Sequence, residues 1–216
     1  MRIRSVLSAC YKLKERLRLK LSILLYNRHL SRILPEIASH RPVRIMFYVN
    51  NLSMWKNDRL LMILKNDDRF QPFIVTYLYP SDTTGHKKSL EQQLRDHFGP
   101  MGIIIESGFD FGRNRLYPVS RFKPDILFYP QPYRNRLKDI PRNVLLSYIP
   151  YCFEMEDERH FYNTLYQNIC WKIFVPTELH RELKARYNFN GGRNVVVSGN
   201  PLADYFFDGH IPQADI

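Results

Sequence analysis

Short apolar runs of strand length recur along most of the chain and alternate with polar-faced segments of helix length. The runs are rich in Val, Ile, Phe and Tyr, and they are continuous rather than alternating, which is typical of parallel strands buried on both faces. The predicted strands cover 43–49, 73–79, 102–106, 125–129, 144–149, 171–175 and 194–197, and the predicted helices cover 54–65, 87–98, 154–169 and 177–187. The pattern therefore predicts an α/β fold, with a Rossmann-like parallel sheet that has helices on both faces, over residues 43–208.

The first 34 residues follow a different pattern, with apolar positions in steps of three and four that place them on one face of a helix. These positions are Ile3, Val6, Cys10, Leu13, Leu17, Leu21 and Leu24. The longest uncharged run, 21–27, is far shorter than the ~20 residues that span a bilayer. Lys12 and Lys14 interrupt the apolar stretch that a secretory signal would need after Arg2 and Arg4. Pro35 and Pro42 predict a break between this helix and the domain.

The positive charge of the chain is concentrated in this helix. The chain has 32 Lys and Arg against 21 Asp and Glu, a net charge of +11, and residues 1–34 hold nine of the basic side chains against one acid. The remaining 182 residues carry 23 basic and 20 acidic side chains, so the domain is almost neutral. Residues 1–34 are thus a basic amphipathic helix ahead of a nearly neutral domain.

Two interpretations of the basic helix stay open. It can lie in the membrane interface against anionic lipid, or it can pack on the domain with a solvated basic face. Nucleic acid is not an expected partner, because stacking aromatics do not alternate with the basic residues. We expect residues 1–34 to bind an anionic membrane surface in a salt-sensitive way.

Several kinds of chemistry are excluded by the motifs the sequence lacks. It contains no GxGxxG, GxxxxGK[ST], HExxH or GxSxG element. Its three cysteines are odd in number and form no CxxC, which favours a reducing compartment, and its seven histidines show no metal-ligand spacing. We therefore expect no metal and no cofactor.

Two aromatic–proline segments, 128–133 and 148–153, each follow a predicted strand, and an asparagine pair follows the first strand. In open parallel sheets, ligands bind beyond the carboxyl ends of the strands. The candidate substrate-binding residues are accordingly Asn50, Asn51, Gln131, Tyr133 and Tyr151. The alternative for each of them is rigid packing of the loop against the sheet.

The densest acidic cluster is 154–158, at the start of a predicted helix. The helix dipole favours acids in a first turn, so solvated charge is the ordinary interpretation, and a metal site or a base is the functional one. Glu154 lies nearest to the preceding strand end and is the candidate catalytic residue, as a general base.

The segment 194–204 is the most specific, because a strand runs directly into Gly199, Asn200 and Pro201, and Asp204 follows three residues later. This resembles the end of the first domain in two-domain GT-B glycosyltransferases and in nucleotide-sugar epimerases of that fold. Further elements are KPDILFY at 123–129, SYIPY at 147–151, KIFVPTE at 172–178 and VSGNP at 197–201. In their order they resemble the CDP-glycerol glycerophosphotransferase family, over roughly residues 43–208.

This resemblance implies a transferase of surface-polysaccharide or teichoic-acid-like polymer synthesis, working at the inner face of the cell membrane with a nucleotide-activated donor and a membrane-linked acceptor. Family members place acceptor and catalytic groups on the first domain and donor contacts mainly on the second. Gly199, Asn200, Pro201 and Asp204 would lie at the hinge between the two domains, and residues 209–216 would begin the hinge or a tail.

The chain departs from the family pattern in two ways. Many members carry a Trp-His-Gly element whose histidine is a base, where this chain has 148–151, and the 216 residues contain no second domain. We therefore expect a fragment, a truncated protein or half of a split enzyme, inactive by itself. The alternative is a non-catalytic, membrane-associated binding or assembly module of the same fold.

Overall fold

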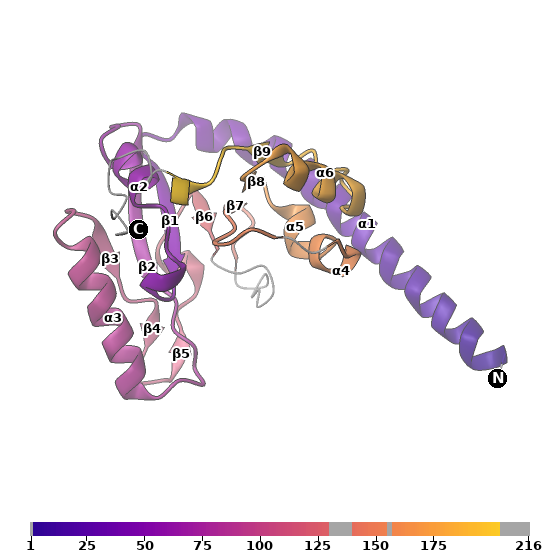
Figure 1. Cartoon of the computed structure of the whole chain (residues 1–216), viewed down its shortest axis with the longest axis horizontal. Helices are drawn as coiled ribbons and strands as arrows, with labels where there is room; N and C mark the ends of the chain where they lie inside the picture. The colour runs from indigo at the N-terminus through magenta and orange to yellow at the C-terminus, as the bar shows by residue number, and fades with distance from the viewer. Residues whose placement is uncertain (1, 130–139, 155–156, 204–216) are drawn as a thin grey trace, which may run out of the picture.

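The computed structural model describes residues 2–129, 140–154 and 157–203. Within these ranges the chain forms one seven-stranded sheet and a small two-stranded one (Figure 1). The strands of the large sheet are β1 Val43–Val49, β2 Phe70–Thr76, β3 Ile104–Glu106, β6 Ile126–Phe128, β7 Leu145–Tyr148, β8 Lys172–Val175 and β9 Val195–Val197. All neighbouring pairs are parallel, in the order β3-β2-β1-β6-β7-β8-β9. The predicted Rossmann-like α/β fold is confirmed.

The helices lie between the strands as the pattern predicts, with differences at their ends. They are α2 Asp58–Lys65, α3 Thr84–Phe98, α4 Arg159–Tyr162, α5 Leu165–Ile169 and α6 Glu178–Tyr187. The single helix predicted over 154–169 is wrong, because the described part of this segment contains two short helices. The Thr164 side chain accepts a hydrogen bond from the backbone N–H of Gln167 at 3.2 Å, so a new N-cap starts α5 there.

The second predicted strand is shifted, since β2 begins at Phe70 and includes Pro72. Pro72 pairs with Ile45 of β1, whereas pairing with β3 starts only at Phe73. The side of β2 next to Pro72 is therefore an edge, where a residue without an N–H costs no ladder hydrogen bond. A small hairpin, β4 Phe109–Asp110 with β5 Arg115–Leu116, follows β3.

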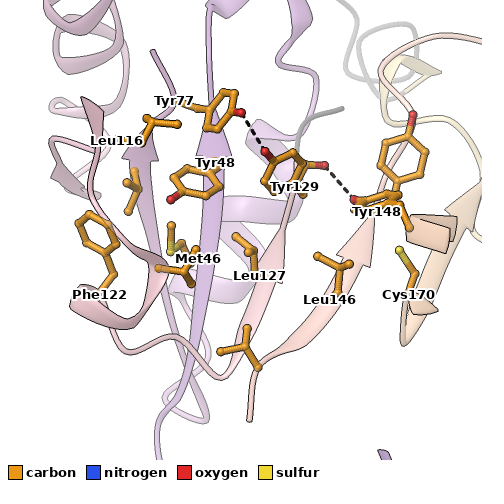
Figure 2. Packing of buried hydrophobic residues seen from close by; sticks show 14 of the residues in the cluster. Met46, Tyr48, Tyr77, Leu116, Phe122, Leu127, Tyr129, Leu146, Tyr148 and Cys170 are labelled. Atoms are coloured by element: carbon orange, nitrogen blue, oxygen red, sulfur yellow. Dashed lines mark hydrogen bonds between the residues drawn. The ribbon is translucent and has the colours of Figure 1, made fainter. Parts of the chain in front are cut away.

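The sheet separates two hydrophobic clusters, because alternate side chains of each strand point to opposite faces. Met46 and Tyr48 of β1 lie in one cluster with Leu127, Leu146 and Cys170, as Figure 2 shows. On the other face, a second cluster joins strand residues to α1, α2 and α3. Its helix members are Ile33, Ile37, Leu61, Leu94 and Phe98.

The N-terminal helix α1 spans Arg2–Ser39 and runs through Pro35, so the break expected at Pro35 is absent. Proline removes one helical hydrogen bond. Ile33 and Ile37 on either side of it are buried against the sheet, and this packing offsets the loss. Figure 1 shows the N-terminal turns of α1 (indigo) extending well past the sheet and its other helices.

Candidate functional site

A small crevice lies where the carboxyl ends of β1 and β6 meet. Strand order reverses at this point, since β2 and β3 follow on one side of β1 and β6 to β9 on the other. Such a switch point is where ligands bind in open α/β sheets. The crevice has a cavity volume of about 40 Å³, and its lining includes Asn50, Asn51, Trp55, Asn57, Tyr129 and Tyr151.

Rigid aromatic walls form one side of the crevice. The Phe47 ring stacks on Phe128 with centroids 4.7 Å apart and meets Trp55 edge-on at 5.5 Å. The Trp55 indole N–H donates to Asp58 Oδ1 at 2.6 Å, and His97 Nε2 lies 3.0 Å from the same oxygen. These contacts hold Trp55 in one orientation against the crevice.

The two predicted asparagines both line the crevice and both hold its loop together. Buried Asn50 donates from Nδ2 to the carbonyl oxygen of Tyr77 at 2.6 Å. Asn51 Oδ1 accepts from Ser53 Oγ at 2.6 Å and from the N–H of Met54 at 3.2 Å, which caps the short helix η1 Leu52–Met54. Both side chains lie at the strand end, as the sequence predicts, and their observed contacts are with the protein's own loop. Their role in substrate binding stays a prediction.

Asn57 also lines the crevice, and sequence reasoning missed it. It occupies the N-cap position of α2 but makes no capping bond, and its Oδ1 is buried with no hydrogen-bond partner in the described part of the chain. A buried amide oxygen without a partner is uncommon in folded proteins. The sequence pattern placed Asn57 inside the predicted helix 54–65, whereas α2 begins only at Asp58, so the residue was not recognised as part of the loop after β1.

Tyr151 lies at the rim of the crevice with 42% of its surface exposed. The charge of the neighbouring Cys152 thiolate, partial burial and a hydrogen bond to Cys152 raise the pKa of the Tyr151 hydroxyl, so at neutral pH it is a neutral donor. Gln131 and Tyr133 lie outside the described residues, as does Asp204. Gly199 bends the chain after β9 with φ +83°, and Pro201 opens the short helix η4 Pro201–Ala203.

Glu154 lies in a buried cluster and is not among the residues that line the crevice. Its Oε2 accepts from Lys184 Nζ at 2.6 Å, and its Oε1 accepts from the Tyr148 hydroxyl at 3.3 Å. Only 7% of the Glu154 side chain and none of the Lys184 side chain is exposed. The Tyr162 ring lies under the ammonium group at 4.9 Å. This ion pair ties the loop after β7 to α6.

His180 lies on α6, one turn before Lys184, and is 5% exposed. Its Nδ1 lies 2.7 Å from Thr177 Oγ1, and its Nε2 is buried without a hydrogen-bond partner among the described residues. Burial lowers the pKa of the imidazole; the charge of Glu154 opposes this and that of Lys184 adds to it. The imidazole is therefore neutral at pH 7. The sequence around His180 contains no motif that predicts a buried histidine there.

Neither a metal-binding cluster nor a membrane-spanning helix occurs among the described residues. No three His, Cys, Asp or Glu side chains in the described part come close enough together to hold a metal ion. None of the helices in that part is both long and apolar enough to cross a bilayer. No family model and no curated protein matches the sequence.

Proposed function

We propose that this chain is the N-terminal, acceptor-side domain of a glycosyltransferase or glycerophosphotransferase of surface-polymer synthesis. The observation that supports it is the meeting of two segments that carry the family resemblance. Phe128 and Tyr129 end the KPDILFY element, Ile149 and Tyr151 belong to SYIPY, and all four line one crevice at the switch point of the sheet. A crevice of aromatic walls with a few amides and a phenol suits a polyol or sugar hydroxyl.

The composition of the crevice favours the acceptor over the donor. Transfer to a hydroxyl requires a base and positive groups or donors that stabilise the departing phosphate. Among the described residues that line the crevice there is no Lys, Arg or His. The nucleotide-activated donor would then contact mainly a second domain, as the resemblance implies, and the membrane-linked acceptor would bring the domain to the inner face of the membrane.

The base role of Glu154 stays a prediction. Its two carboxylate oxygens accept hydrogen bonds from Lys184 and Tyr148, and only 7% of the side chain is exposed, so an acceptor hydroxyl would have to reach a buried, paired carboxylate. The same geometry favours the second candidate function, a non-catalytic binding or assembly module of this fold. In that module the ion pair only stabilises the loop.

Acceptor binding can be tested by fluorescence, because Trp55 lies in the crevice wall. In a Trp171→Phe background, which leaves Trp55 as the single tryptophan, glycerol phosphate oligomers and neutral oligosaccharides are titrated into the chain. We expect one of these probes to change Trp55 emission saturably, and Tyr151→Ala to weaken its binding about tenfold. Leu179→Ala, an exposed position on α6, is the matched control. Failure of both probes, or binding unchanged by Tyr151→Ala, would contradict the proposal.

Catalysis is tested in the complete protein with CDP-glycerol or a nucleotide sugar and a membrane acceptor. Loss of transfer in Glu154→Gln with folding intact supports the base role, and full activity removes it. Transfer by the 216-residue chain alone would contradict the expectation that a second domain supplies the donor site.

A further inference from the structure

Helix α1 has two apolar faces, and the domain covers only one of them. Ile23, Ile33 and Ile37 are buried against the domain. A second set is exposed, with 51–58% of each side chain accessible: Leu13, Leu17, Leu21, Leu24 and Leu25. At 3.6 residues per turn these leucines fall within a sector of about 120° opposite the buried isoleucines. The described members of the apolar row recognised from the sequence, Leu13, Leu17, Leu21 and Leu24, therefore face the solvent.

The exposed leucines are flanked by positive charge. Lys14, Lys20, Arg28 and Arg32 are all exposed, and no acidic residue occurs between positions 16 and 35. Apolar side chains with interspersed Lys and Arg are the composition of helices that lie in the plane of a membrane interface. Long basic side chains can keep their charges at the headgroups while the leucines enter the acyl boundary.

A groove of about 600 Å³ continues this surface towards the domain. It lies between α1 and the segment that precedes β7, with Arg28, Arg32 and Arg142 beside the apolar side chains of Val144, Leu146 and Ile169. No acidic residue lines the described part of it. Guanidinium groups bind phosphate oxygens in a bidentate manner, and the neighbouring apolar wall suits hydrocarbon.

We propose that the leucine face of α1 and this groove together form a binding surface for anionic phospholipid. The leucines enter the bilayer interface, and the three arginines contact headgroup phosphates. A second copy of the chain is a poorer occupant, because pairing two such faces would bring the flanking lysines and arginines of one copy against those of the other. The proposal does not depend on the transferase proposal, since it uses none of the crevice residues.

Co-sedimentation of the full chain with vesicles tests this. We expect binding to equimolar phosphatidylglycerol and phosphatidylcholine, little binding to phosphatidylcholine alone, and weakening at 0.5 M salt. Leu17→Gln with Leu21→Gln should reduce binding at least tenfold. Arg28→Gln, Arg32→Gln and Arg142→Gln together should reduce it by about 100-fold. Ile63→Gln and Leu179→Gln, which change equally exposed apolar residues outside α1, should have no effect.

Circular dichroism verifies that each variant folds, and the Trp55 titration shows whether the crevice is intact. Equal binding to both vesicle types, no binding to either, or binding unchanged by the leucine or arginine variants would overturn the proposal. A concentration-dependent dimer that the leucine variant dissociates, without vesicle binding, would assign the face to a second copy. Loss of vesicle binding with unchanged crevice titration leaves the transferase proposal standing.

Discussion

Lys184 on α6 donates a hydrogen bond to Glu154 at 2.6 Å, and the two buried side chains join segments thirty positions apart. Removing one partner of a buried pair leaves an uncompensated charge. We expect Lys184→Met to lower the free energy of unfolding by about 3–5 kcal/mol, measured by urea denaturation.

Arg186→Met is the control for this substitution, because Arg186 lies on the same helix and contacts Asp157 at the surface. It should cost no more than about 1 kcal/mol. The double variant Glu154→Gln, Lys184→Met should be more stable than Lys184→Met alone. Equal losses of unfolding free energy in Lys184→Met and Arg186→Met would show that the buried ion pair stabilises the fold no more than the surface pair does.

His180 predicts a pH dependence of stability. Its pKa is lowered in the folded state by burial, so below the unfolded value of ~6.5 the unfolded chain binds a proton that the folded chain does not. The free energy of unfolding should therefore fall as pH drops from 7.5 to 5.5, and His180→Gln should flatten this slope. His160→Gln, at a side chain 69% exposed, should leave it unchanged. If the free energy of unfolding fell with pH as steeply in His180→Gln as in the unchanged chain, His180 would not be the group responsible for the pH dependence.

Gln167 on α5 is wholly buried, and within the described part of the chain neither its side-chain Oε1 nor its Nε2 has a hydrogen-bond partner. A buried polar group without partners costs about 1–3 kcal/mol. Gln167→Met keeps the shape and removes that cost, so we expect a gain of about 1 kcal/mol in thermal or urea denaturation. Gln93→Met on the exposed face of α3 should change stability by less than about 0.5 kcal/mol. Destabilisation by Gln167→Met would indicate a partner for the amide.

The two asparagines at the crevice should respond differently to alanine. Asn51→Ala removes the cap of η1 and should cost about 1 kcal/mol of stability. Asn57→Ala removes an oxygen that has no partner among the residues that the structure describes, so it should leave stability unchanged within about 0.5 kcal/mol while weakening binding of the acceptor probe. Equal stability losses would mean that Asn57 has only a structural role.

The strands and the rim of the crevice could be predicted because their signals are local. β1 and β7 read as continuous apolar runs since both faces of the sheet are covered, and the residues after a parallel strand necessarily reach its carboxyl edge. Asn50, Asn51 and Tyr151 follow strands and do line the crevice. Asn57 escaped prediction because the apolar pattern extended the helix back to residue 54, whereas α2 begins at Asp58 and leaves Asn57 in the loop that lines the crevice.

The sequence alone determined the succession of strands along the chain, the nearly neutral charge of the domain and the basic N-terminal helix. Buried strands appear as apolar runs, helix faces appear as apolar steps of three and four, and charge follows directly from composition. The tertiary structure decided which of the two apolar faces of α1 meets the sheet, since periodicity says only which positions share a face. It also decided that Glu154 pairs with Lys184, because a side-chain contact between segments thirty residues apart depends on how α6 packs beside β8 and β9.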